Sequence, residues 1–95
     1  HSALLSKDIK RVAILGGSGS FAIESAMAQG ADAYITADLK YHDFFRAEES
    51  CLLVDVGHYE SEQFTKITII KHLNENFPNF AFISSKMDTN PVHYF

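Results

Sequence analysis

Four short apolar segments along the 95-residue chain predict β-strands. Each is a nearly continuous run of apolar side chains, without the regular alternation of a half-exposed strand. Continuous runs are typical of strands that are buried on both faces of a parallel sheet. The four predicted strands are Arg11–Leu15, Ala33–Thr36, Cys51–Val56 and Phe80–Ser84.

Between these strands, apolar residues recur at spacings of three and four and predict helices over Ser20–Gln29, Leu39–Glu49 and Tyr59–Phe77. The centre of the last segment, Lys66–Ile70, is β-branched and would favour a strand by propensity alone. We expect a helix there because the helical spacing continues on both sides. The order β-α-β-α-β-α-β predicts a single layered α/β domain over residues 1–95 with a mostly parallel sheet.

Charge and cysteine content exclude several classes of function. Eight Lys and Arg against twelve Asp and Glu give a net charge of −4, so we expect no nucleic-acid partner. No apolar run approaches the roughly 18 residues of a membrane span, and no membrane partner is expected. The single cysteine, Cys51, allows neither an internal disulfide nor a cysteine-rich zinc site, and favours a cytoplasmic location. The chain begins with His1, and we expect it to be part of a longer protein.

The strongest candidate for chemistry directly follows the third predicted strand. His58 and Glu62 are four residues apart at a helix start, so both side chains lie on one face. An imidazole and a carboxylate placed in this way can bind a divalent metal. Asp55, inside the strand, can supply another oxygen or orient a histidine. The plainer interpretation is a solvated first turn in which the helix dipole favours the acidic residue.

A glycine-rich turn, Gly16–Ser20, joins the first strand to the first helix. Backbone N–H groups in such a turn can bind phosphate, which makes Gly16, Gly17 and Ser18 candidate substrate contacts. The turn matches neither the G-x-G-x-x-G pattern nor the phosphate-binding loop that ends in lysine. A tight turn capped by Ser18 or Ser20 therefore remains the alternative.

Charged residues also cluster after the second predicted strand. Asp38, Lys40, His42 and Asp43 follow its carboxyl end, as the other two segments follow theirs. The carboxyl ends of parallel strands share one edge of a sheet, so all three segments can line one rim. The alternative is a solvated helix start that Asp38 caps.

Four segments together resemble the C-terminal part of the NIF-three-like family, whose bacterial members are often called GTP cyclohydrolase I type 2 homologues. They occur in the family's order and spacing, and the resemblance covers Arg11 to Phe95. The segments are Gly16–Ser20, Thr36–Asp43, Asp55–Glu62 and Asp88–Pro91.

The resemblance implies two divalent metal ions in a cleft between two similar α/β lobes, within a toroidal homohexamer. The family's C-terminal ligands, a histidine and a glutamate four residues later, fall on His58 and Glu62. Lys40, His42 and the glycine turn then become candidates for contact with substrate or with the metal ligands. Zinc, manganese, iron, cobalt and nickel all suit such a donor set.

One departure from the family pattern limits what this chain can do alone. The family's other ligands, a histidine pair and an aspartate, come from the N-terminal lobe, and this chain has no His-His pair. We therefore expect half of a cleft, inactive alone. The intact protein is then a metal-dependent hydrolase acting on a nucleotide, with catalytic residues undefined. The alternatives are a non-catalytic metal-binding scaffold or regulatory protein-interaction module, and a phosphate-binding module that uses only the glycine turn.

Overall fold

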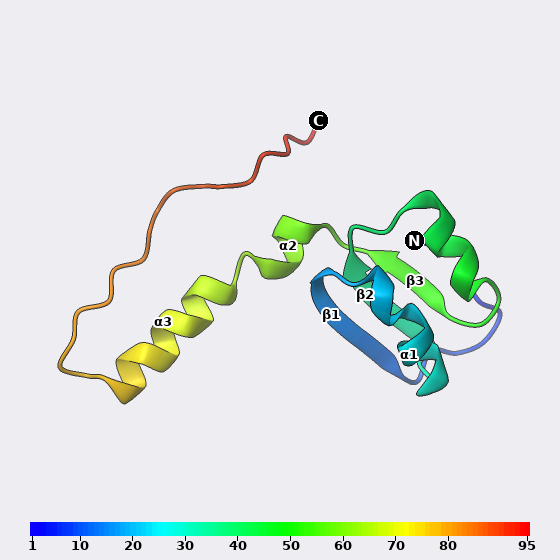
Figure 1. Ribbon diagram of the computed structural model, residues 1–95, viewed down its shortest axis with the longest axis horizontal. Coiled ribbons are helices and arrows are strands. Elements are labelled where there is room, and N and C mark those ends of the chain that lie inside the picture. Colours follow the sequence, from blue (N-terminus) through cyan, green and yellow to red (C-terminus); the bar gives the residue numbers. More distant parts are fainter. The chain divides into compact units, whose positions relative to one another are not determined.

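A three-stranded parallel sheet organises the first part of the chain (Figure 1). The computed structural model describes all residues 1–95. The strands lie in the order β1-β2-β3, and Ala33 of β2 pairs with Val12 on one side and with Leu52 on the other. This arrangement confirms the predicted α/β class. The strands are β1 (Val12–Ser18), β2 (Ala33–Ala37) and β3 (Leu52–Asp55).

The helices are shorter than the hydrophobic pattern predicts. Two of them, η1 and η2, have the tighter 3-10 geometry, and the predicted helix Tyr59–Phe77 is divided at Gln63 and Phe64 into α2 and α3. The β-branched segment Lys66–Ile70 is helical, as the apolar spacing predicts. No helix combines the length and the apolar character needed to cross a membrane. The helices are η1 (Ser20–Ala22), α1 (Ile23–Ala28), η2 (Tyr41–Ala47), α2 (His58–Glu62) and α3 (Thr65–Asn76).

The chain divides into two structural units, residues 1–62 and residues 63–95. The first unit contains the sheet, and the second contains α3 and the C-terminal segment. The predicted fourth strand, Phe80–Ser84, is wrong, because these residues form no strand. An extended segment needs a neighbouring strand to satisfy its backbone, and the second unit contains no other strand. Instead, the Phe80 ring packs edge-on against Phe77, with 6.5 Å between ring centroids.

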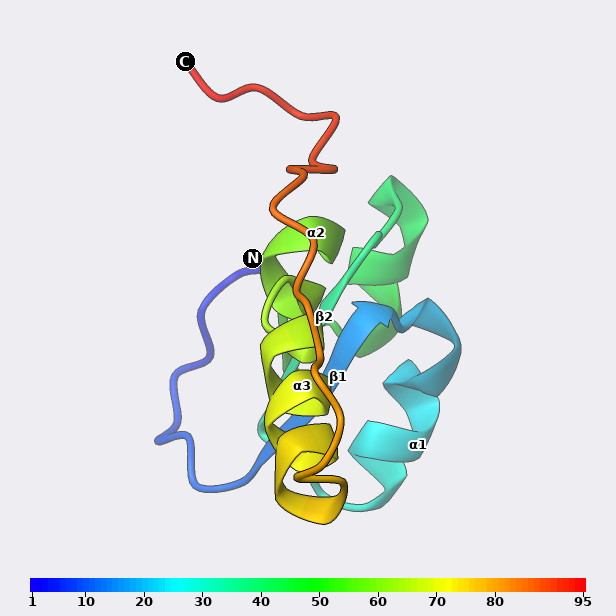
Figure 2. The ribbon, with the colours of Figure 1, turned by 90° about the vertical axis from the view of Figure 1, so that its left-hand side faces the viewer.

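The hydrophobic core lies between the sheet and the two helical segments α1 and η2. In Figure 2, α1 and η2 (green) lie on the same side of the sheet. The sheet contributes Tyr34 and Leu53, which are 2% and 0% exposed, and α1 contributes Ile23 at 0%. Arg46 of η2 donates hydrogen bonds to Glu24 of α1 and so joins the two helical segments at the surface. This packing fixes the strands whose carboxyl ends carry the candidate site.

The opposite face of the sheet carries apolar side chains that the first unit leaves uncovered. Val12 and Ile14 of β1 are 47% and 74% exposed. Ile35 and Val54 continue the same face on the neighbouring strands and are half-buried.

Asp32 joins three segments at the amino ends of the strands. Its carboxylate accepts hydrogen bonds from the backbone N–H groups of Lys10 and Arg11, at 3.1 and 3.0 Å, and forms an ion pair with Lys7 at 2.9 Å. The backbone carbonyl of Asp32 accepts a hydrogen bond from the backbone N–H of Leu52. The hydrogen bond from Lys7, followed by those from the backbone, holds the pKa of Asp32 far below its ordinary value of 3.8.

We expect Asp32→Asn to lower the melting temperature at neutral pH. A carboxyl whose pKa is depressed by folding stabilises the fold above its ordinary pKa and loses that contribution as the pH falls. The Tm difference from the parent chain should therefore be largest at neutral pH and shrink well below 3.8. Circular dichroism melts across this pH range measure it, with Asp8→Asn at an exposed position as the control. A Tm difference that does not change with pH would contradict this account.

Candidate functional site

His58 and Glu62, the first and last residues of α2, converge on one side of the helix, as their spacing predicts. His58 directly follows Gly57, which connects β3 to the helix. The Nε2 atom of His58 lies 3.2 Å from Oε2 of Glu62, and the two side chains are 49% and 51% exposed. A nitrogen donor and an oxygen donor on one helical turn thus lie close together, and both side chains are open to solvent.

Asp38 binds the other ring nitrogen of His58. Its Oδ2 atom lies 2.6 Å from Nδ1 of the histidine. This hydrogen bond is the main reason why the pKa of His58 is raised above its ordinary value, and the nearby charge of Glu62 raises it further. The alternative role for Asp38, as a helix cap, is wrong. The capping position of η2 is Lys40, the residue before the helix, whose backbone N–H donates to Asp43 at 2.9 Å.

Asp55 holds the two loops that carry Asp38 and His58. Its Oδ2 accepts a hydrogen bond from the backbone N–H of Leu39 at 2.8 Å, and its Oδ1 accepts from Gly57 at 3.0 Å. The hydrogen bonds of Asp55 go to backbone N–H groups on either side of the pair. Asp55 positions the neighbouring backbone of both loops, and Asp38 is the carboxylate that contacts the ring.

Gly17 brings the glycine-rich turn against the two candidate ligands. Its backbone N–H donates to Oγ of Ser61 at 2.9 Å, and that hydroxyl donates in turn to the carbonyl of His58 at 2.9 Å. A Cβ atom on Gly17 would lie 2.3 Å from Oε1 of Glu62 and 3.3 Å from Nε2 of His58. A larger residue would displace the Glu62 carboxylate, and the φ of +70° also favours glycine.

The hydrogen bonds of the glycine-rich turn argue against a phosphate-binding role. Two hydroxyls from β2 bind its carbonyls, Tyr34 to Gly19 at 2.9 Å and Thr36 to Gly17 at 3.0 Å. The N–H of Gly19 donates to the carbonyl of Ala37, and the N–H of Gly17 is bound to a serine hydroxyl. These two N–H groups are therefore already used within the protein and do not form a phosphate cradle.

The other predicted residues of this rim are more peripheral. Gly16 and Ser18 are exposed, and no serine side chain caps η1. Lys40 and His42 are also exposed, and the ring of His42 packs edge-on against its neighbour Tyr41. The contacts of His58 described above involve none of these four residues.

The structure contains no group of three or more histidine, cysteine or acidic side chains that could hold a metal ion. Zinc sites in proteins use three or four protein ligands. His58 and Glu62 are therefore two converging donors without the rest of a coordination shell.

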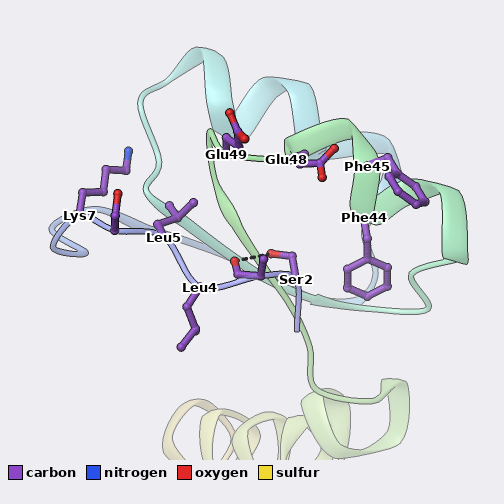
Figure 3. Close-up of a pocket in the computed structure, with 10 residues that line it drawn as sticks. Ser2, Leu4, Leu5, Lys7, Phe44, Phe45, Glu48 and Glu49 are labelled. Carbon is purple, nitrogen blue, oxygen red and sulfur yellow. Dashed lines mark hydrogen bonds between the residues drawn. The ribbon is translucent and has the colours of Figure 1, made fainter.

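A separate pocket of about 690 Å³ lies between the N-terminal segment and η2 (Figure 3). Leu4 and Leu5 belong to one wall, and Phe44, Phe45 and Glu48 belong to the other. None of the candidate metal ligands lines this pocket.

Gly17→Ala should destabilise the fold and displace Glu62. The residue has a φ of +70°, and the new Cβ would overlap the Glu62 carboxylate. A non-glycine residue in such a conformation costs of the order of 1–3 kcal/mol. Chemical unfolding measures the loss, and chemical shifts of His58 and Glu62 report the displacement.

Gly16→Ala is the matched control, because a Cβ at that position would meet its nearest atom at an ordinary 3.6 Å. Equal losses of stability in the two variants would contradict the close approach assigned to Gly17.

Comparison with known proteins identifies relatives that are much longer. The family model for Duf34/NIF3 (NGG1p interacting factor 3) matches residues 1–91. A protein of Nostoc sp. called GTP cyclohydrolase 1 type 2 homolog is 43% identical over 63 residues, which are 65% of this chain and 24% of that protein. A Campylobacter jejuni protein of the same name is 38% identical over 90 residues, covering 94% of this chain and 35% of that protein.

Solved structures agree with the family match. The crystal structure of a Staphylococcus aureus protein, 34% identical, superimposes with a TM-score of 0.72 and covers 92% of this chain and 30% of that one. A Bacillus cereus protein related to NIF3, 30% identical, gives a TM-score of 0.67 with coverages of 92% and 25%. The chain thus spans about a quarter to a third of the length of these relatives. The predicted resemblance is confirmed, and the chain belongs to the Duf34/NIF3 family.

Proposed function

We propose that this chain supplies part of a divalent metal site, with Nε2 of His58 and the carboxylate of Glu62 as ligands. The observation that carries the proposal is the pair of contacts on one imidazole ring. Nε2 faces Glu62 at 3.2 Å, and Nδ1 is bound by Asp38 at 2.6 Å. Metal-binding histidines usually donate their other ring N–H to a carboxylate or carbonyl in this way.

Two further features favour a metal site over an ordinary surface pair. Exposed ion pairs contribute little to stability and need no special backbone to support them. Here Gly17 adopts a positive φ and approaches Glu62 so closely that any other residue would displace the carboxylate. Ser61 ties that glycine to the carbonyl of His58. The surrounding backbone is thus built around the two donors.

The remaining ligands have to come from outside these 95 residues. The relatives are much longer than this chain, whose matched residues cover only 24% of one and 35% of the other. We propose that the whole protein holds two divalent ions, with this chain contributing His58 and Glu62. The histidine and carboxylate donors fit zinc, manganese, iron, cobalt or nickel.

For the whole protein we propose a metal-dependent hydrolase that acts on a nucleotide. The name that its relatives carry, GTP cyclohydrolase 1 type 2 homolog, supports this choice. A metal bound at this position would supply a Lewis acid. His58 and Glu62 would hold it, Asp38 would orient the imidazole, and Gly17 would keep Glu62 in place.

Zinc ions added to the chain should perturb the site before any other region. In ¹H–¹⁵N spectra recorded during a Zn²⁺ titration, we expect the first and largest shifts at Gly17, His58 and Glu62. His58→Ala and Glu62→Gln should each remove them, because neither remaining donor can hold the ion alone. His72→Ala, on the exposed α3, is the matched control and should leave the shifts unchanged.

Shifts centred on other acidic residues, or unchanged binding in His58→Ala, would contradict the assignment of these ligands.

In a metal-loaded protein of the relatives' full length, nucleotide hydrolysis should depend on both ligands. His58→Ala and Glu62→Gln should each lower kcat/KM by at least an order of magnitude, whereas His72→Ala should not. Product analysis by chromatography measures turnover across a panel of nucleotides and pH values. Bound metal without turnover of any nucleotide would contradict the hydrolase and favour a metal-binding scaffold or regulatory module.

A further inference from the structure

We infer that Asp38 is a positioning residue that fixes the proton of His58 on Nδ1 and thereby presents Nε2 toward Glu62. The identity of the ion that Nε2 would bind rests on the proposed function. The state of the imidazole itself does not, and it can be observed without any metal.

The contact with Asp38 determines which ring nitrogen of His58 carries the proton. An ionised carboxylate accepts hydrogen bonds and cannot donate them. Both ring nitrogens face a carboxylate, but Nδ1 lies 2.6 Å from Oδ2 of Asp38, whereas Nε2 lies 3.2 Å from Oε2 of Glu62. The shorter contact assigns the proton of the neutral imidazole to Nδ1. The lone pair is then left on Nε2, which is the nitrogen that faces Glu62 at 3.2 Å.

The backbone conformation of Asp38 is uncommon. Its φ is +58°, in the left-handed region, where few residues other than glycine are found and where aspartate and asparagine are enriched. This conformation directly follows β2, at the point where the chain turns toward η2. The backbone therefore adopts an uncommon conformation at the position from which the carboxylate reaches His58.

Asp55 supports the backbone next to both Asp38 and His58. The Asp55 carboxylate accepts hydrogen bonds from two backbone N–H groups. One belongs to Leu39, the residue after Asp38, and the other to Gly57, the residue before His58. One carboxylate thus links the loops that carry the two members of the pair. The relative position of Asp38 and His58 is determined by this link and by the pairing of β2 with β3, and does not depend on their own contact alone.

The hydrogen bond with Asp38 restricts which ring nitrogen of His58 can bind a metal ion. With Nδ1 bound to Asp38, an ion can reach the imidazole only on the side of Glu62 and Gly17. Binding through Nδ1, with Asp38 as a direct ligand, would require this hydrogen bond to break. Asp38 therefore acts through His58.

Nuclear magnetic resonance of the His58 ring tests the inference on the metal-free chain. Long-range ¹H–¹⁵N correlations, recorded above the pH at which His58 titrates, distinguish a protonated Nδ1 from a protonated Nε2. We expect Nδ1–H in the parent chain. Asp38→Gly tolerates the positive φ but removes the carboxylate, so it should lose this preference. Asp38→Asn keeps a carbonyl acceptor and should largely retain it, as should the exposed control Asp8→Asn.

Zn²⁺ affinity, measured by calorimetry on the same variants, gives the functional readout. Loss of a partner that orients a metal-binding histidine typically weakens binding by roughly 10- to 100-fold. We expect a loss of this size in Asp38→Gly and a smaller loss in Asp38→Asn. Thermal melts of each variant confirm that the fold is retained.

Nε2–H in the parent chain, or Nδ1–H that persists in Asp38→Gly, would overturn the inference. So would Zn²⁺ affinity that is unchanged in Asp38→Gly but lost in His58→Ala. If the parent chain binds Zn²⁺ only at other residues, the proposed ligands fail, and the ring tautomer alone then decides whether Asp38 positions His58.

Discussion

The candidate site depends on one carboxylate that holds two loops together. Parallel pairing brings the carboxyl ends of β2 and β3 to the same edge of the sheet, but it does not determine how the chain continues beyond them. Asp55 fixes the path of both loops, because it accepts hydrogen bonds from the backbone N–H groups of Leu39 and Gly57, one in each loop. The meeting of Asp38 with His58, and the direction in which Nε2 points, both follow from this connection.

The glycine-rich turn contributes a second constraint, which is steric. Gly17 has to lie against Glu62, and Gly19 has to lie against Thr36, where a Cβ would fall 2.0 Å from the threonine hydroxyl. The hydroxyls of Tyr34 and Thr36 satisfy the buried carbonyls of the turn. Glycine-rich turns between a strand and a helix are associated with phosphate binding. In this chain Gly17 allows close packing against α2, and Gly19 allows close packing against β2.

Sequence reasoning could predict the elements whose signal is local. Continuous apolar runs located three strands, and the spacing of His58 and Glu62 placed them on one face, because both are properties of short segments. The partner of the histidine is not local. Asp38 and Asp55 are both aspartates at strand ends, and only the backbone geometry shows that one contacts the ring and the other holds the loops. The sequence does not indicate the positive φ of Asp38, although aspartate tolerates this conformation better than most residues. Phe80–Ser84 has strand propensity but no partner strand within its unit, and propensity cannot supply one.

The central claim is that the chain presents two metal ligands, Nε2 of His58 and the carboxylate of Glu62, and leaves the coordination of the ion to be completed from outside. The most direct test is an anomalous difference map from crystals of the chain grown with Zn²⁺. The account predicts a peak about 2.0–2.1 Å from Nε2 of His58, on the side of Glu62, with Asp38 still bound to Nδ1. A zinc peak on Nδ1 of His58, or zinc bound only at other residues, would contradict it.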